Sequence, residues 1–204
     1  MDIKFIDTIL AESSQTNYSL HGSHEQNITN AFYKCSALYK SVRKKYDDLA
    51  YSNHIRMVAA AASKNFTIQS AEEKTNIIIS CFAHDLIEDA RVSFNDLDSL
   101  FGRKVAEMVF AVTDYTGKNR ESRAPYDKIR GVKGATYVKL CDRYANGAYS
   151  YLTGSPMFNK YKSEYAKFRR ELHVNDLEGL NDGLWEHCDG LFDFEEPKEI
   201  QLNS

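Results

Sequence analysis

Apolar residues recur at intervals of three and four along most of this chain, and little interrupts them. The sequence contains only 3 Pro and 10 Gly among its 204 residues. This spacing is typical of amphipathic helices, whereas strands would show alternation at every second residue. The pattern therefore predicts an all-α fold, a helical bundle in which short polar stretches separate the helices.

Turn and capping residues predict where individual helices begin and end. Ser70 and Glu73 have the spacing of a capping box, in which each side chain bonds the other residue's backbone N–H, and Gly102 is placed to end a helix. A polar loop rich in Lys, Arg and Gly is expected at 115–133. The predicted helices cover residues 26–45, a segment from about His54, 70–89, 93–101, 103–114, 134–152, 156–173 and 176–193.

Length and composition indicate a single domain. A chain of 204 residues with 43% hydrophobic residues can bury one substantial core, and two domains would each be small. We expect a polar N-terminal segment at 1–25, one domain at 26–194 and a frayed polar tail at 195–204. A second catalytic or regulatory domain has no room in a chain of this length.

The charge balance argues against a general nucleic-acid-binding surface. The formal net charge is −3, and the basic residues form short local clusters instead of one long stripe. A small anionic ligand fits such clusters better than a nucleic acid does. The sequence does not indicate an oligomeric state.

Cysteine usage and the N-terminus favour a soluble cytoplasmic protein. The cysteines are far apart, form no Cys-x-x-Cys motif, and in two cases (Cys81 and Cys141) lie in apolar helical patterns, so we expect buried reduced thiols. Residues 1–7 carry acids where a signal peptide would be basic. No apolar run approaches the roughly 18 residues that a membrane span needs, so no membrane partner is expected.

Residues 82–89 read Phe-Ala-His-Asp-Leu-Ile-Glu-Asp and place ionisable groups directly after an apolar run at 77–83. Burying an unsatisfied polar group costs roughly 2–7 kcal/mol, so His84 and Asp85 require a partner. A His-Asp pair followed by Glu-Asp at this spacing arises by chance about 0.002 times in a chain of this composition. The segment therefore predicts a functional site.

A bound metal ion explains this segment physically. Imidazole and carboxylate groups both donate lone pairs to a cation, and the cation offsets negative charge that would otherwise be buried. On a continuous helix, His84 would share a face with Glu88, and Asp85 would share a face with Asp89. One turn would then present two ligands and two acid/base groups to the same pocket.

Further ligands would have to come from other parts of the chain. His54 begins a helical segment whose following residues are small and apolar. Asp142 lies four residues after Val138 and four before Asn146, which places it on a core-facing stripe. A carboxylate in that position also needs a partner.

Each of these residues has a purely structural interpretation as well. His54 could make a local hydrogen bond at a helix start, and Asp142 could pair with its neighbour Arg143 at the surface. Glu88 and Asp89 could be solvated acids at a helix end, although acids there oppose the helix dipole. The basic residues that follow Val42 could likewise form a solvated charged surface.

The motifs together resemble those of the HD-type metal hydrolases, and specifically the (p)ppGpp hydrolases, which include the hydrolase half of RelA/SpoT enzymes and the small stand-alone alarmone hydrolases. The resemblance extends over about residues 26–175. It rests on Val42-Arg43-Lys44, Tyr51-Ser52-Asn53-His54, His84-Asp85 with Glu88-Asp89, Phe101-Gly102, Val112-Thr113-Asp114, the segment from Lys139 to Asn146, and the helix that follows at 157–169.

The resemblance implies a fold, a metal and a reaction. It implies an HD-type helical bundle that hydrolyses the 3′ pyrophosphate of ppGpp or pppGpp, giving GDP or GTP and pyrophosphate. The metal would be one divalent ion, usually manganese in this family, although the ligand types alone would suit zinc or iron equally well. The implied metal ligands are His54, His84, Asp85 and Asp142.

The resemblance also implies roles for the remaining motif residues. Glu88 would orient or deprotonate a metal-activated water, and Asp89 is the candidate for proton transfer to the leaving oxygen. The implied substrate-binding residues are Arg43, Lys44, Tyr144 and Asn146. In the loop at 115–133, Lys118, Arg120 and Arg123 are further candidates for contact with the distal phosphates.

The chain departs from the family pattern in ways that bear on substrate choice. The interval of 30 residues from His54 to His84 is longer than is typical, and the interval of 57 residues from Asp85 to Asp142 is shorter. The loop at 115–133 lacks the family's usual sequence. Two alternatives to an alarmone hydrolase therefore remain: an HD-type phosphohydrolase for another nucleotide (a nucleoside monophosphate, a cyclic dinucleotide or NADPH), or a non-catalytic nucleotide-binding module.

Overall fold

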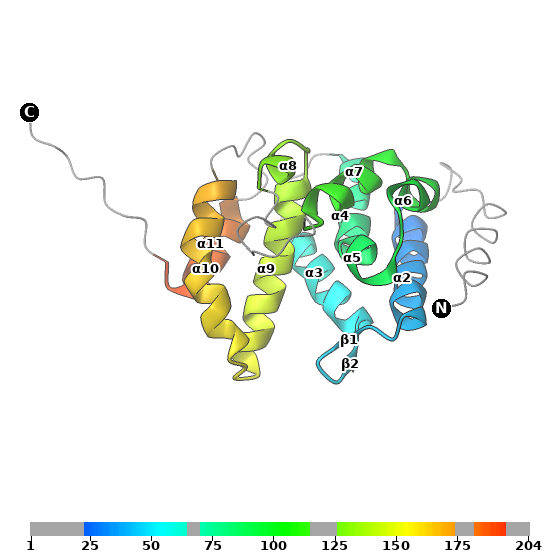
Figure 1. Cartoon of the computed structure of the whole chain (residues 1–204). Helices are drawn as coiled ribbons and strands as arrows, with labels where there is room; N and C mark the ends of the chain where they lie inside the picture. The colour runs from blue at the N-terminus through cyan, green and yellow to red at the C-terminus, as the bar shows by residue number, and fades with distance from the viewer. Residues whose placement is uncertain (1–22, 65–69, 115–125, 174–181, 195–204) are drawn as a thin grey trace, which may run out of the picture.

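A computed structural model describes residues 23–64, 70–114, 126–173 and 182–194, and Figure 1 shows how its elements are arranged. The predicted all-α fold is confirmed, since the strand structure within these ranges is one short antiparallel hairpin of β1 (Lys45–Tyr46) and β2 (Leu49–Ala50). The helices are α2 (His24–Ser41), α3 (Ser52–Lys64), α4 (Ala71–Ala83), α5 (Leu86–Ala90), α6 (Phe94–Phe101), α7 (Arg103–Val112), α8 (Tyr126–Arg130), α9 (Ala135–Leu152), α10 (Met157–Leu172) and α11 (Asp182–Phe192).

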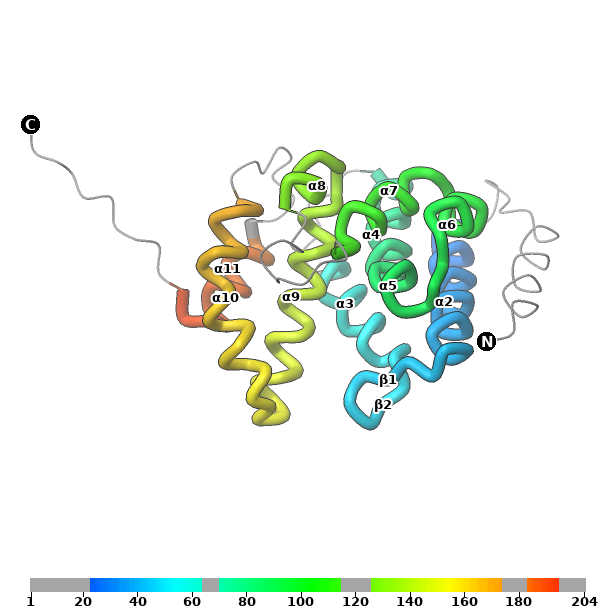
Figure 2. Tube along the Cα trace, viewed as in Figure 1, coloured from blue at the N-terminus to red at the C-terminus, as the bar shows by residue number. Residues whose placement is uncertain are grey.

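Helix α9 forms the centre of the bundle. It contacts α3, α4 and α7 as well as α10 and α11, while α2 packs against α4, and α6 packs against α7. Figure 2 shows the resulting order, with α10 and α11 at one end of the molecule and α2 and α6 at the other. The buried side chains form one continuous core, whose largest members include Tyr39, Tyr137, Tyr165, Phe168 and Trp185.

Local capping signals set several helix ends close to their predicted positions. Ser93 forms a complete capping box with Asp96 at the start of α6: the Ser93 hydroxyl accepts from the Asp96 N–H (3.2 Å), and the Ser93 N–H donates to Asp96 Oδ2 (2.8 Å). Of the two hydrogen bonds predicted for the capping box at the start of α4, the first forms and the second does not. The Ser70 hydroxyl accepts from the Glu73 N–H (3.4 Å), but the Glu73 carboxylate binds Lys133 instead (2.7 Å).

The first helix is shorter than predicted, because α2 ends at Ser41 and not near residue 45. The Arg43 N–H donates to the Lys40 carbonyl (3.0 Å), and the Lys44 N–H donates to the Tyr39 carbonyl (3.0 Å), with Arg43 in the left-handed region at φ 57°. This pair of bonds is a Schellman motif, which closes a helix and reverses the chain. The hairpin follows directly from it.

The predicted helix at 70–89 is broken in two at His84 and Asp85, where α4 ends and α5 has not yet begun. Asp85 has φ −103° and ψ 6°, outside helical geometry. The Tyr39 hydroxyl, from α2, donates to the Phe82 carbonyl (3.3 Å) and accepts from the Asp85 N–H (3.2 Å). The continuous helix predicted through the motif is therefore wrong, since a distant side chain satisfies the backbone at the break.

Some predictions fall partly or wholly outside the described residues. The expected loop at 115–133 ends in helix α8, which the sequence did not predict, and residues 115–125 with Lys118, Arg120 and Arg123 lie outside the described part. The described part of the last predicted helix begins at Asp182. Most of the N-terminal segment and the tail at 195–204 also lie outside.

The expected reduced thiols are confirmed, because all four cysteines are free and buried. Each lies in a helix that contributes to the core. Among the described helices, none is both long enough and apolar enough to cross a membrane.

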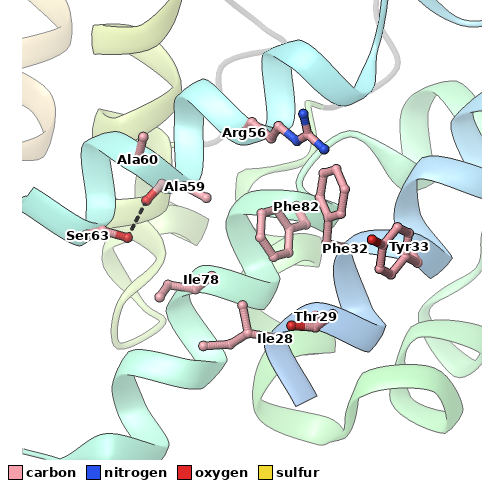
Figure 3. Close-up of a pocket in the computed structure, with 10 residues that line it drawn as sticks. All are labelled: Ile28, Thr29, Phe32, Tyr33, Arg56, Ala59, Ala60, Ser63, Ile78 and Phe82. Atoms are coloured by element: carbon pink, nitrogen blue, oxygen red, sulfur yellow. Dashed lines mark hydrogen bonds between the residues drawn. The ribbon is translucent and has the colours of Figure 1, made fainter. Parts of the chain in front are cut away.

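A hollow of about 370 Å³ opens between α2, α3 and α4 (Figure 3). Its walls are largely apolar, with Phe32 from α2 and Ile78 and Phe82 from α4. The Arg56 guanidinium lies 4.6 Å from the centre of the Phe32 ring. None of the predicted site residues lines this hollow.

Candidate active site

Two buried imidazoles face each other at the centre of the candidate site. His54 is carried by the first turn of α3 and His84 by the break between α4 and α5, and their Nε2 atoms are 3.4 Å apart. Both residues are buried. His84 Nδ1 lies 2.9 Å from the Cys81 carbonyl oxygen, which can only accept, so Nδ1 carries the proton. The nitrogen that remains, His84 Nε2, points at the site.

Two carboxylates complete the cluster around these nitrogens. Asp142 Oδ1, from α9, lies 3.2 Å from His54 Nε2 and 3.5 Å from His84 Nε2. Asp85 Oδ2 lies 3.1 Å from His84 Nε2. His54, His84 and Asp85 have one ligand atom each within 4.8 Å of one another. Residues from three separate segments are thus gathered at one point.

The electrostatics of the cluster favour positive charge between these donors. Burial alone would lower the pKa of His84, but the carboxylates of Asp85 and Asp142 raise it well above its usual value. Burial would also raise the pKa of both carboxyls, yet the His84 imidazole holds the pKa of each below its usual range. Either a proton or a metal ion supplies the required charge.

The residues present fit a divalent metal ion. Nitrogen and oxygen donors bound to one ion at about 2.1 Å lie about 3.0–3.4 Å apart in tetrahedral or octahedral geometry. The separations of 3.1, 3.2 and 3.4 Å within the cluster lie in that range, and the separation of 3.5 Å between His84 Nε2 and Asp142 Oδ1 lies 0.1 Å above it. Imidazole and carboxylate ligands suit manganese, iron and zinc alike.

Neighbouring side chains support the two carboxylates. The Tyr51 hydroxyl donates to Asp85 Oδ2, and Asn146 Nδ2 donates to Asp142 Oδ1 (2.6 Å). Hydrogen bonds of this kind orient ligands toward a metal. The resemblance singled out Asn146 for substrate binding, whereas Tyr51 was present only as part of a motif and had no assigned role.

The two expected acid/base residues lie at the edge of the cluster on α5. The Asp114 N–H donates to Glu88 Oε1 (2.7 Å), and Asp89 Oδ2 forms an ion pair with Lys44 Nζ (2.8 Å). Desolvation raises the pKa of the Glu88 carboxyl, and the nearby charge of Asp85 adds to this effect, while the bond from Asp114 opposes it. Glu88 is therefore closer to a neutral-pH base than a free glutamate is.

A half-buried lysine that the sequence left without a role lies near Glu88. Lys139 Nζ is 3.4 Å from the Val112 carbonyl oxygen. Burial lowers its pKa, but Asp142, Asp114 and other nearby carboxylates raise it by more, so its pKa is above the usual value. Its place three residues before Asp142 on the same stripe of α9 is the signal that would have identified it.

No protein-family model matches this chain. The guanosine-3′,5′-bis(diphosphate) 3′-pyrophosphohydrolase MESH1 of Drosophila melanogaster is 25% identical over 154 residues, which cover 74% of this chain and 83% of the relative. The resemblance to the (p)ppGpp hydrolases is confirmed.

A solved structure, described as a metazoan ortholog of SpoT that hydrolyzes ppGpp and plays a role in starvation responses, has the same fold. The TM-score is 0.63, with 22% sequence identity, and the match covers 82% of this chain and 94% of that chain. The helical bundle that the resemblance implied is therefore confirmed.

Not every residue implied by the resemblance reaches the cluster. Tyr144 lies on another side of α9 from Asp142, and its ring meets that of His187 in α11, with 6.2 Å between ring centres. Arg43 is exposed, and no described contact joins its side chain to the cluster. The structure therefore turns Tyr144 away from the cluster and leaves Arg43 at the surface, next to Lys44 in the chain.

The alternative interpretation of Asp142 as one half of a surface ion pair is wrong. Arg143 bonds Glu164 on α10 instead (3.3 Å), and its guanidinium lies over the Phe168 ring at 4.8 Å. Asp142 meanwhile faces His54. Adjacent residues on a helix point in directions about 100° apart, so these two side chains serve different interfaces.

Proposed function

We propose that this chain is a metal-dependent hydrolase that removes the 3′ pyrophosphate of (p)ppGpp, giving GDP or GTP and pyrophosphate. The observation that carries the proposal is the convergence of two imidazole nitrogens and two carboxylates at 3.1–3.5 Å. MESH1, a relative that covers most of this chain, is named for the same reaction.

In this proposal His54, His84, Asp85 and Asp142 hold one divalent metal, and manganese is the ion we propose. The metal when bound lowers the pKa of a coordinated water and makes hydroxide available near neutral pH. The tautomer of His84 is already suited to this role, because Nδ1 donates to the Cys81 carbonyl and leaves Nε2 free of a proton once a cation is bound.

Glu88 and Asp89 divide the proton transfers between them. Glu88 accepts a proton from the attacking water, since its pKa is raised and the Asp114 N–H holds one of its oxygens in place. Asp89 passes the proton that Glu88 receives on to the leaving ribose oxygen as the bond from that oxygen to phosphorus breaks, and its ion pair with Lys44 fixes its position. The two residues are adjacent on α5, where Glu88 is exposed and Asp89 is half-buried.

The substrate binds through the positive and polar side chains near Glu88 and Asp89. Lys44 and Arg43 lie where α2 turns into the hairpin, and they attract the phosphates of a nucleotide. Lys139 adds a positive charge near Glu88 and Asp142, and Asn146 binds the ribose. Tyr144 has no part in the proposal because it packs toward α11.

The domain at 26–194 would contain this whole machinery, and a cytoplasmic location fits a nucleotide substrate and reduced thiols. The substrate in this view is a small molecule. Neither a nucleic acid nor a membrane is part of the proposal.

The experiment that tests the proposal uses purified protein, stripped of metal and then resupplied with Mn²⁺. It is incubated with ppGpp and with a panel containing a nucleoside monophosphate, a cyclic dinucleotide and NADPH, and the products are separated by anion-exchange chromatography. GDP and pyrophosphate that form only with metal are the expected result. Turnover of another nucleotide with ppGpp untouched would mean that the substrate is wrong, and turnover of none would indicate a binding module.

A further inference from the structure

The hairpin of β1 and β2 lies beside the start of α3 (Figure 1), and one of its aromatic side chains contacts the candidate metal cluster. Tyr46, the last residue of β1, stacks on the His54 ring, with 4.5 Å between ring centres and an interplanar angle of 16°. The Tyr149 ring meets Tyr46 edge-on at 4.7 Å. The Tyr46 ring is thus held between the start of α3 and the last turn of α9.

The Tyr46 hydroxyl is the first link in a hydrogen-bond chain that ends at the imidazoles. It donates to Asn146 Oδ1 (2.8 Å), Asn146 Nδ2 donates to Asp142 Oδ1 (2.6 Å), and Asp142 Oδ1 lies 3.2 Å from His54 Nε2. The two ends of the Asn146 amide have different partners, because the Asp142 carboxylate can only accept. Tyr46 therefore locks the amide in the orientation that Asp142 needs.

We propose that Tyr46 is a positioning residue of this site: through Asn146 it aims the Asp142 carboxylate at the two imidazoles, and through its ring it holds His54 in place. This inference rests on the proposed metal centre and extends it to a residue that touches neither the metal nor the reacting atoms. Side chains in such positions set metal affinity even when they donate nothing to the ion.

The backbone supports this assignment, because the hairpin is built to present Tyr46. Arg43 and Asp47 both have positive φ, at 57° and 49°, so the chain makes two tight turns on either side of β1. The two strands are only two residues each, with Tyr46 paired to Leu49. Non-glycine residues are uncommon in this conformation, and it is found where the surrounding structure demands it.

The test compares the binding of Mn²⁺ alone to four full-length proteins: wild type, Tyr46→Phe, Tyr46→Ala and Tyr151→Phe. Tyr151 is an exposed tyrosine at the end of the same helix as Asn146 and is the matched control. The dissociation constant is read from the electron paramagnetic resonance signal of free Mn²⁺, and a melting curve of each metal-free protein reports folding.

We expect Tyr46→Phe, which removes only the hydroxyl, to raise the Mn²⁺ dissociation constant about 10-fold, and Tyr46→Ala to raise it toward 100-fold. Tyr151→Phe should leave it unchanged. In an Asn146→Ala background, Tyr46→Phe should have almost no further effect, because the hydroxyl acts through the amide.

Dissociation constants within about twofold of wild type for both Tyr46 variants would overturn the inference, as would an undiminished effect of Tyr46→Phe in the Asn146→Ala background. A wild-type protein that binds no Mn²⁺ would overturn both this inference and the proposed metal centre. Failure of the wild type to hydrolyse ppGpp, with Mn²⁺ binding intact, would refute only the substrate and leave the role of Tyr46 to be decided by the binding data.

Discussion

At the scale of single residues, Glu88 and Asp89 show how neighbours on a short helix acquire different environments. Glu88 accepts a backbone N–H and is partly desolvated, whereas Asp89 is paired with Lys44. Pairs of carboxyl groups whose surroundings differ in this way are suited to different roles in acid–base chemistry. The assignment of the base to Glu88 can be tested directly.

Replacing Glu88 by Gln should reduce turnover by about 10²–10⁴-fold, because the amide keeps the bond from Asp114 but cannot accept a proton. Metal content, measured by elemental analysis, should stay the same. Glu107→Gln is the control, since Glu107 is exposed on α7 and forms a surface ion pair with Arg103. An undiminished rate in the Glu88 variant would remove this residue from the mechanism.

The pKa of His84 leads to a prediction about the metal-free protein. The folded state holds the His84 pKa well above 6.5, so its contribution to stability is fully present below pH 6.5 and is lost as pH rises through the folded-state pKa. We expect the melting temperature of metal-free protein to fall over a pH interval that begins near 6.5 and extends upward from there. The same proton must leave before a metal binds, so Mn²⁺ affinity should rise over that interval.

Melting curves across this range, with and without Mn²⁺, measure both effects. His84→Gln should remove this part of the pH dependence, whereas His187→Gln, at an exposed position on α11, should retain it. A metal-free melting temperature that rises with pH would contradict the prediction.

At the scale of elements, the break between α4 and α5 is what turns His84 and Asp85 toward the cluster. The Tyr39 hydroxyl satisfies both the Phe82 carbonyl and the Asp85 N–H there, and it is buried. An apolar replacement would leave a buried donor and a buried acceptor without a partner, at a cost of about 1–3 kcal/mol for each group.

Tyr39→Phe should therefore destabilise the protein more than Tyr137→Phe, since the Tyr137 hydroxyl donates to a carbonyl within a continuous helix, that of Ala62 in α3 (3.0 Å). Urea unfolding of the metal-free variants gives the comparison. Equal free energies of unfolding for the two variants would mean that the hydroxyl of Tyr39 does not hold the break.

At the scale of the whole molecule, the cluster connects three segments that are far apart in sequence. His54 and His84 are 30 residues apart in the chain, and Asp142 comes from the central helix, which contacts α3, α4 and α7. A ligand that binds only the folded protein stabilises it by an amount set by its concentration, about 2.7 kcal/mol at 100 times the dissociation constant.

Mn²⁺ should accordingly raise the melting temperature of the wild-type protein, and a chelator should reverse the shift. Asp142→Asn should lose the shift because it removes a charged donor that faces both imidazoles. Asp98→Asn, on the surface of α6, should keep it. An Asp142 variant that retains the full shift would place the metal elsewhere.

Much of this architecture follows from local sequence. Helix spacing, the capping residues at Ser93 and the buried cysteines depend on interactions within a few residues or on burial of an apolar face, so the pattern of the chain predicts them. The motif at His84 likewise indicates a site, because ionisable groups after an apolar run need a partner.

Other features were not predictable from local pattern. The chain was expected to be helical through His84, but the Tyr39 hydroxyl replaces the missing helix bond from 46 residues away. The short helix α8 and the hairpin after α2 also escaped prediction, since each is only a few residues long and carries too little periodic signal.

The sequence alone determined which residues are candidates for the site, an all-α fold, and the family that the motifs resemble. The tertiary structure decided which side chains lie near one another. It brings the nitrogen and oxygen donors within 3.5 Å and turns Tyr144 away from them. It also brings Tyr46 into a hydrogen bond with Asn146, 100 residues away in the chain. The reason is physical. Periodicity and capping are set by neighbours along the chain, whereas the position of a side chain in a site depends on the packing of helices that the chain brings together only once it is folded.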